Sequence, residues 1–379
     1  MRLRQIGRIA EVAPAAWDAL FDPHYPFIRH AFLEALETHR CVGPGTGWQP
    51  CHLLLEDTDG RLIGAAPLYL KTHSYGEFVF DFGWAEASQR MGRPYYPKLL
   101  CAIPFTPVNG PRLGAASPEA HRALAGALAA LGRDSEASSL HALFLQDDDR
   151  AALGAEGLVE RHDVQFQWSN RGYADFEAFL AALRSDKRRK IRQERQHLAR
   201  AGLRFEWRAG DQLDEPEWQA VYRLYANTYE ERGQAPYLTP GFLLDYGRRT
   251  GTPLRLALVW EESRLVAVAL CLRGGDRLYG RHWGAADRYH ALHFETCYYQ
   301  GIEYCIREGL RHFDAGTQGE HKLARGFVPV TTRSGHVLAD ERLHAAVSAH
   351  LQRERAFVES RHAELWRHVP YKEGATPDG

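Results

Sequence analysis

The chain of 379 residues lacks the cysteine patterns that mark metal-binding or disulfide-stabilised proteins. Its six cysteines form no CxxC pair and no Cys/His ligand cluster, and they are too sparse to build a disulfide framework in a chain of this length. We therefore expect buried free thiols and no metal cofactor.

Long apolar runs and a strong net charge are also missing. No segment approaches the roughly 20 apolar residues that a membrane-crossing helix needs, and the first residues lack the continuous apolar core of a secretion signal. The formal net charge is −1, so no global field attracts nucleic acid or a membrane surface. These absences predict a cytoplasmic protein without transmembrane association, in which any polyanion binds to a local feature.

Four common catalytic motifs are absent as well. The sequence contains no P-loop, no GxGxxG after a first strand, no HExxH and no GxSxG. These absences argue against nucleotide kinases, Rossmann oxidoreductases, zinc proteases of the HExxH type and serine hydrolases with a nucleophile elbow.

The two halves of the chain show similar orders of helical and strand patterns. In the first half, helical periodicity in 15–20 and 26–39 precedes two strands in 51–71, joined by a turn at Asp57 to Gly60. A further strand at 74–85, a helix at 118–131 and a strand at 138–146 are expected next.

The second half begins with two helices in 175–202, the second capped by Ser185 and stopped by Gly202. A helix in 215–232, three strands in 253–285, a helix in 293–310 and a strand in 311–316 follow. This recurrence predicts an internal structural duplication with domains at 1–165 and 166–379.

The second half contains a strongly basic helix. Nine Lys or Arg residues occur in 184–204, against two acids. Arg188, Arg192 and Arg195 share one face at i, i+4, i+7 spacing, and arginine matches the geometry of phosphate and carboxylate oxygens. The face is a candidate for binding a pyrophosphate, a nucleotide or an RNA backbone; the alternative is a solvated face that pairs with acids elsewhere.

The segment 279–295 connects an expected strand end to the start of a helix. Arg281 and Trp283 lie in the strand, and His293 and Glu295 lie in the first helical turn, where unpaired N–H groups favour anions. Either His293 or Glu295 is a candidate base for an attacking amine. The alternative is that His293 packs at a polar rim and Glu295 complements the helix dipole.

The segment HFDAGTQGEHKLARGF, residues 312–327, runs from an expected strand into a polar loop. Open mixed sheets commonly place ligands at the end of a strand, and the two glycines of the loop permit close approach of the backbone. We expect this loop to face a ligand rather than solvent alone. Its polar residues are Gln318, Glu320, His321, Lys322 and Arg325.

The first half has a polar cluster of its own among aromatic residues. Lys71, His73, Glu77, Asp81 and Lys98 occur close to tyrosines and phenylalanines. They could wall a groove, or the aromatic side chains could form core.

The sequence resembles the Fem-like (peptidoglycan biosynthesis/recognition) N-acyltransferases of the GNAT superfamily, from about Ala15 to Tyr371. The resemblance is carried by WQPCHLLLEDTDGRLIGAAPLYLKTHSYGEFVFD, YYPKL, PFTPVNGPR, FLAALRSDKRRKIRQERQ, HFETCYYQGIEYCI and GTQGEHKLARGF. It implies an α+β fold of two tandem GNAT-like domains, each a mostly antiparallel mixed sheet flanked by helices. It also implies acyl transfer to an amine.

The resemblance leaves two donors open. Fem relatives use aminoacyl-tRNA and carry an R-x-x-I-R helix, which this chain matches at Arg188 to Arg192, whereas ordinary GNAT proteins use acyl-CoA. The usual GNAT pyrophosphate signature, Gln/Arg-x-x-Gly-x-Gly/Ala, is replaced here by AADRYHALHFE.

We expect transfer of an acyl or aminoacyl group from acyl-CoA, or alternatively aminoacyl-tRNA, to a small-molecule or peptide amine. A non-catalytic module that recognises a cell-wall or peptide ligand is the remaining alternative. The expected catalytic residues are His293, Glu295, Glu320, His321 and Lys322, and the expected donor-binding residues are Arg188, Arg192, Arg195, Arg281, Trp283, Gln318 and Arg325.

Overall fold

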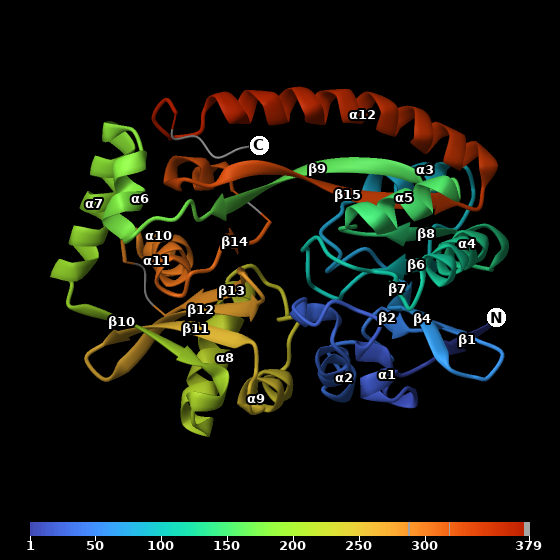
Figure 1. Ribbon diagram of the computed structural model, residues 1–379, viewed down its shortest axis with the longest axis horizontal. Helices are drawn as coiled ribbons and strands as arrows, with labels where there is room; N and C mark the ends of the chain where they lie inside the picture. The colour runs from blue at the N-terminus through green and yellow to red at the C-terminus, as the bar shows by residue number, and fades with distance from the viewer. Residues whose placement is uncertain (287–288, 318, 375–379) are drawn as a thin grey trace. The chain divides into compact units, whose positions relative to one another are not determined.

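The computed structural model describes residues 1–286, 289–317 and 319–374, and the chain divides into two compact units (Figure 1). Unit 1 comprises Met1–Asp163 and Thr331–Ser360, and unit 2 comprises Val164–Val330 and the segment from Arg361 onward. The first division lies two residues from the expected boundary at 165/166.

Residues 331–360 group with unit 1, whereas the expected second domain ran without interruption to the C-terminus. The reason is packing. The end of strand β15 (Val328–Leu338) pairs with β8 (Ser139–Ala142) of unit 1. The first half of helix α12 (Glu341–Arg367) then buries Leu343, Val347 and Leu351 against Trp84 and Tyr95.

Unit 1 contains two sheets. The first has the order β1-β3-β4-β7, formed by Arg2–Ile6, His52–Glu56, Leu62–Ala66 and Gly114–Ala115. The second has the order β15-β8-β6-β5-β2 and adds β6 (Lys98–Cys101), β5 (Leu68–Lys71) and β2 (Trp48–Pro50). The α-helices of the unit are α1 (Pro14–Asp18), α2 (His30–Thr38), α3 (Phe82–Arg90), α4 (Pro118–Asp134), α5 (Asp147–Ala155) and the start of α12.

The strand predicted at 74–85 is wrong. Residues 74–81 form no regular element, and α3 begins at Phe82. Glu77 and Asp81 are buried because both carboxylates bind the ammonium group of Lys98, and Phe78 adopts a left-handed backbone with φ 62°. These long-range ion pairs override the alternating pattern that favours a strand.

Unit 2 is built around a sheet in the order β10-β11-β12-β13-β14-β9. Every neighbouring pair is antiparallel except β13–β14, which is parallel, so the predicted mostly antiparallel mixed sheet is confirmed. The strands are Leu203–Ala209, Leu254–Glu261, Arg264–Gly274, Arg277–Ala285, His312–Asp314 and Val159–Ser169, respectively.

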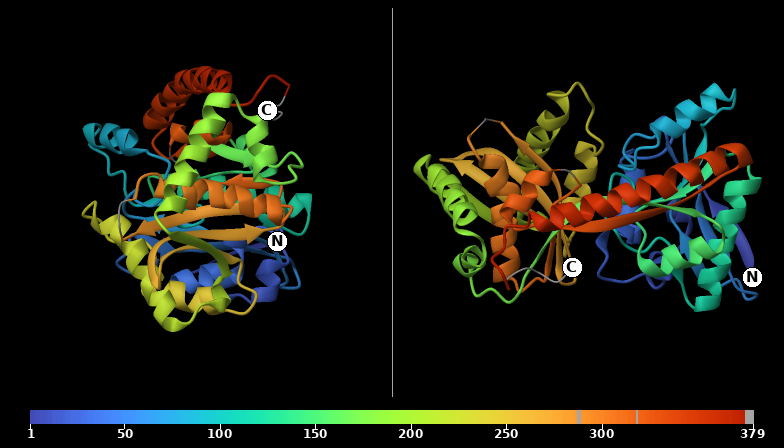
Figure 2. Two further views of the ribbon diagram at one scale, coloured as in Figure 1. Left: turned by 90° about the vertical axis from the view of Figure 1, so that its left-hand side faces the viewer. Right: turned by 90° about the horizontal axis from the view of Figure 1, so that it is seen from above.

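Helices cover both faces of this sheet (Figures 1 and 2). Helices α8 (Glu215–Glu230) and α9 (Pro240–Arg248) lie on one face, and α10 (Leu292–Phe294) and α11 (Gln300–Arg307) lie on the other. Helices α6 (Phe176–Ala182) and α7 (Ser185–Arg200) precede β10.

Local signals explain where the longer helices begin and end. Helix α8 starts after Asp214, whose side chain accepts a hydrogen bond from the backbone of Glu217. Ser185 is the first residue of α7 rather than its cap, because the cap position belongs to Arg184. Gly202, with φ 75°, ends α7 as expected. Across the described ranges, no helix combines the length and apolar character needed to cross a membrane.

Candidate active site

The parallel strands β13 and β14 diverge soon after they pair. Their ladder ends at the pair Tyr279–Asp314, where β14 stops, whereas β13 continues to Ala285. Strand edges released in this way at the carboxyl end of parallel strands offer backbone donors and acceptors to a ligand. The divergence therefore defines the candidate site of unit 2.

A β-bulge lies at the same point of β13. Cys271 of β12 pairs with Gly280, and Leu270 pairs with His282, so Arg281 is the extra residue between them. A bulge bends its strand and changes the direction of the side chains that follow. The bulge at Arg281 thus helps to separate β13 from β14.

Lys322 brings an ammonium group to the end of β14. Its Nζ donates a hydrogen bond to the carbonyl oxygen of Gly316, and the residue is only 1% exposed. The pKa of Lys322 is lowered to about 8, mainly by burial; the charge of Asp314 opposes this shift, and the charge of Arg281 contributes to it. At pH 7 the group is mostly protonated, but it releases a proton more readily than a surface lysine.

His293 lies in an aromatic cluster near this lysine. Its ring centroid is 5.2 Å from those of Trp283 and Tyr298 and 6.1 Å from that of His321. Tyr298 Oη lies 2.8 Å from Nε2 of His321. Burial and neighbouring cations lower the pKa of His293 to about 4, so its imidazole is neutral at pH 7.

Arg325 ties the loop after β14 to helix α7. Its Nη2 lies 3.1 and 3.3 Å from the two carboxylate oxygens of Glu194, and its Nη1 donates to the carbonyl oxygen of His321 at 2.8 Å. The guanidinium carbon lies 3.4 Å from the ring centroid of Phe294, and Tyr299 also donates to Glu194. Three segments therefore converge on one buried ion pair, which fixes the loop.

Glu295 belongs to a second ion cluster on the same helical segment. Arg195 Nη2 lies 3.1 Å from Oε1 of Glu295 and 2.6 Å from Oε2 of Glu303, and Gln300 donates to Glu295 at 2.8 Å. Burial raises the pKa of Glu295, although Arg195 opposes the shift. Within the described ranges, Oε2 of Glu295 has no hydrogen-bond partner and is buried.

Arg192 and Glu320, two other expected site residues, lie at the surface. Arg192 pairs with exposed Glu177, and Glu320 pairs with Arg361. Arg188 is half-buried on α7. Gln318 lies outside the described residues. The structure thus gathers Arg281, Trp283, His293, His321, Lys322 and Arg325 around the strand divergence, with Arg195 and Glu295 in the adjoining cluster.

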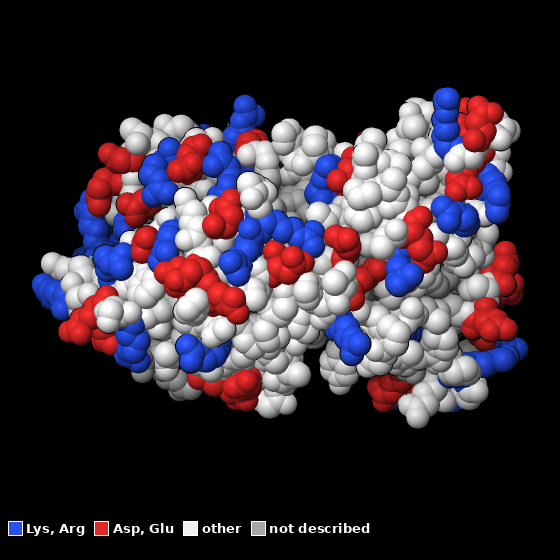
Figure 3. All heavy atoms as spheres, turned by 90° about the horizontal axis from the view of Figure 1, so that it is seen from below, with Lys and Arg blue, Asp and Glu red and all other residues white. Residues whose placement is uncertain are grey.

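Charges of both signs are interspersed on the face shown in Figure 3. Lys and Arg side chains alternate there with Asp and Glu side chains, so this face carries no broad region of one sign. Within the described residues, no group of three His, Cys, Asp or Glu side chains is arranged to hold a metal ion.

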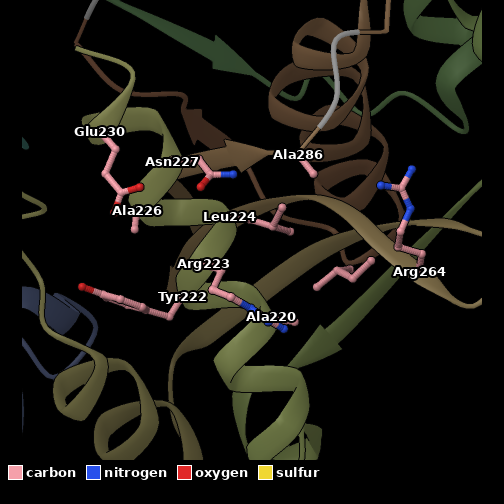
Figure 4. A pocket seen from close by; sticks show the side chains of 10 residues that line it. Ala220, Tyr222, Arg223, Leu224, Ala226, Asn227, Glu230, Arg264 and Ala286 are labelled. Atoms are coloured by element: carbon pink, nitrogen blue, oxygen red, sulfur yellow. The ribbon is translucent and has the colours of Figure 1, made fainter. Parts of the chain in front are cut away.

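A cavity of about 510 Å³ lies along helix α8, on the face of the sheet opposite to α10 and α11 (Figure 4). Gly284 permits the close packing between strand and helix, because a Cβ at this position would lie 1.9 Å from the carbonyl oxygen of Leu224. The cavity is lined by Ala220, Tyr222, Arg223, Leu224, Ala226, Asn227, Glu230, Arg264, Leu265 and Ala286.

The sequence interpretation missed Glu194, Tyr298 and the cavity residues on α8. Tyr298 lies in the helix expected at 293–310, but residues Glu295–Tyr299 form a π-helical turn, which changes the register of the side chains. Arg223, Asn227 and Glu230 do recur at i, i+4, i+7, which is a signal of a shared face. Many solvated helices have polar residues at the same spacing, so this spacing alone does not predict a cavity.

Solved structures share this fold at low sequence identity. The C-terminal domain of a protein described as a lysylphosphatidylglycerol synthetase from Agrobacterium fabrum is 11% identical, with 91% of this chain and 94% of that chain covered and a TM-score of 0.53. L-PGS from Bacillus licheniformis is 10% identical, with 84% and 94% covered and a TM-score of 0.50. A crystal structure of FemX is 13% identical, with 92% and 100% covered and a TM-score of 0.49.

The family relationship comes from the sequence itself. No curated protein matches the chain. The FemAB_like family, described as peptidoglycan biosynthesis/recognition, matches residues 8–373, which is nearly the whole chain. The tandem GNAT-like fold that the sequence predicted agrees with this match. The chain belongs to the FemAB_like family.

Proposed function

We propose that this protein is an N-acyltransferase whose second unit moves an acyl group from acyl-CoA to an amine. The observation that carries the proposal is the divergence of β13 and β14 beside the buried ammonium group of Lys322. Membership of the FemAB_like family and the GNAT-like fold support it.

The chemistry requires a proton acceptor for the amine, a donor for the oxyanion and a proton for the leaving thiolate. The amine nitrogen attacks the thioester carbon, a C–N bond forms, the C–S bond breaks, and the amine loses a proton while the thiolate gains one. Lys322 is suited to stabilise the oxyanion, because a protonated amine has three donor hydrogens and Gly316 engages only part of this capacity. Neutral His293 is suited to accept a hydrogen bond from the attacking amine.

The remaining groups hold this arrangement in place. Arg325 and Glu194 fix the loop that carries Lys322, and Arg195 orients Glu295. Glu295 remains a candidate base because its Oε2 is unpaired within the described residues and its pKa is raised. We assign Arg281 and Trp283 to the wall of the donor site, since both lie on β13 beyond its pairing with β14.

One observation favours aminoacyl-tRNA as a second candidate donor. Arg188, Arg189 and Lys190 on α7 form no ion pair within the described residues, so they are available to phosphates. A tRNA donor predicts steep loss of binding with rising salt, because bound phosphates release counterions. An acyl-CoA donor makes far fewer phosphate contacts, so its binding should weaken only slightly as the salt concentration rises.

A product assay tests the proposal. The protein is incubated with an amine panel and either short-chain acyl-CoAs or aminoacyl-tRNAs, and amide products are detected by mass spectrometry. We expect an amide to form with acyl-CoA, in proportion to the free thiol released. Amide formation from aminoacyl-tRNA alone would transfer the proposal to the second donor. Ligand binding without any product, for either donor, would support a non-catalytic recognition module instead.

A further inference from the structure

The cavity beside α8 has charged groups of opposite sign at its two ends. Figure 4 shows Glu230 at one end and Arg264 at the other, and the side chain of Arg223 points away from Glu230. Asn227 lies between Arg223 and Glu230 on the same helix face. A ligand in this cavity therefore meets guanidinium groups at one end and a carboxylate at the other.

The charges of Arg223 and Glu230 are available to a ligand. Within the described residues, neither Arg223 nor Glu230 forms an ion pair, and both side chains are exposed. Arg264 is partly compensated, because its Nη2 lies 2.5 Å from a carboxylate oxygen of Glu261. Arg223 is thus the stronger candidate for binding an anionic group, and a guanidinium binds a carboxylate through two parallel hydrogen bonds.

The distance between the ends limits the size of the ligand. Seven residues separate Arg223 from Glu230, which corresponds to about 10 Å along an α-helix. An extended peptide advances about 3.3–3.6 Å per residue, so about three residues span this distance. The cavity volume of about 510 Å³ lies within the range of small-ligand sites.

The carboxylate end of the cavity is the end nearer the strand divergence. Helix α8 runs antiparallel to β13: Asn227 donates to the carbonyl oxygen of Ala285, and Thr228 donates to that of Trp283 at 2.8 Å. One residue later, Tyr229 lies close enough to Arg281 for the charge of Arg281 to act on it. Glu230 therefore lies toward the bulge at which β13 leaves β14.

We propose that this cavity binds the acceptor as a short peptide of about three residues with free termini. Arg223 and Arg264 bind its carboxylate, and Glu230 holds its terminal amine toward the divergence of β13 and β14. The assignment as acceptor rests on the proposed transferase function; the binding of the peptide does not.

Calorimetric titration with three probes tests the inference: trialanine, trialanine C-terminal amide and N-acetyl-trialanine. We expect the free peptide to bind at least about tenfold more tightly than either blocked form. Arg223→Gln removes the discrimination between the free acid and the amide. Glu230→Gln removes the discrimination between the free amine and the N-acetyl form.

Arg232→Gln is the matched control, because Arg232 is an exposed arginine just beyond α8 that does not line the cavity. It should leave all three affinities unchanged. Equal affinities for the three probes, no binding of any of them, or equal effects of Arg223→Gln and Arg232→Gln would each overturn the inference.

The product assay separates this inference from the proposed function. Peptide binding with the expected discrimination, but without acylation by any donor, would refute the transferase and leave the peptide site standing. Acylation of amines without a preference for free peptide carboxylates would support the transferase and refute the peptide site.

Discussion

Oη of Tyr298 lies 2.8 Å from Nε2 of His321, so a hydrogen bond joins the helical segment after β13 to the loop after β14. Burial raises the pKa of Tyr298 and lowers the pKa of His321. At pH 7 the phenol is therefore protonated and donates to a neutral imidazole. The phenol also lies beside His293, and in the proposed mechanism it is assigned to protonate the leaving thiolate.

Tyr298→Phe tests this role. We expect kcat for transfer to fall by about 10²-fold while KM changes little, because the phenol acts on the leaving group rather than on substrate binding. His321→Ala should lower kcat as well, and the double variant should be no slower than the slower single variant. The measurement is steady-state kinetics of thiol release. An unchanged kcat for Tyr298→Phe would remove Tyr298 from the mechanism.

The pH dependence of transfer reports on Lys322. Its pKa is lowered to about 8, and the proposed role needs the ammonium form, so kcat/KM should fall as pH rises through about 8. The profile is measured between pH 6 and pH 10 for the wild type and for Lys322→Met. The variant should lose this descending limb. The same limb in both proteins would assign the titration to another group.

The ion pair between Arg325 and Glu194 should be a large contributor to stability. The residues are 4% and 6% exposed, and Glu194→Gln leaves the guanidinium buried without its charged partner. We expect the free energy of unfolding to fall by about 3 kcal/mol. Glu177→Gln is the control, since it breaks only the exposed pair with Arg192 and should cost at most about 1 kcal/mol. Both are measured by urea denaturation, and equal losses would contradict the account.

A buried lysine of unit 1 should make stability depend on pH. Lys71 is fully buried over the ring of Trp48 and 3.9 Å from Glu77, and burial lowers its pKa from 10.5 to about 7. Between these two values the unfolded chain binds the proton and the folded protein does not. Stability from this group therefore rises as pH increases from about 7 to 10.5; it is lost as pH falls over the same range and no longer changes below about 7.

Lys71→Met isolates this contribution. The difference in unfolding free energy between wild type and variant should increase from pH 7 to pH 10, as measured by urea denaturation at several pH values. Lys372→Met, which alters an exposed lysine, should show a difference that does not change with pH. A constant difference for Lys71→Met would show that Lys71 is charged in the folded state.

The elements that the sequence predicted are those with local signals. Strands β11, β12 and β13 follow continuous apolar runs broken by turns, and α8 has a capping box at Asp214 and Glu217. The segment 74–85 failed because its structure depends on Lys98, about 20 residues away, to which Glu77 and Asp81 bind. No local pattern shows such a partner.

In the candidate site, too, residues with a local sequence signal were predictable and their distant partners were not. Loop residues Lys322 and Arg325 were identified because they cluster after a strand, and they do lie at the strand divergence. The partner of Arg325 could not be predicted, since Glu194 belongs to a helix that is otherwise strongly basic. The cavity along α8 depends on how the helix packs on β13, which periodicity does not describe.

The rate of amine-dependent thiol release by Lys322→Met, compared with Lys372→Met, tests the central claim most directly. We expect Lys322→Met to be about 10²–10³-fold slower than the wild type, because a buried oxyanion donor is lost, and Lys372→Met to retain the full rate. Circular dichroism confirms that both variants are folded. Equal rates for the wild type and Lys322→Met would show that transfer does not occur where β13 and β14 diverge.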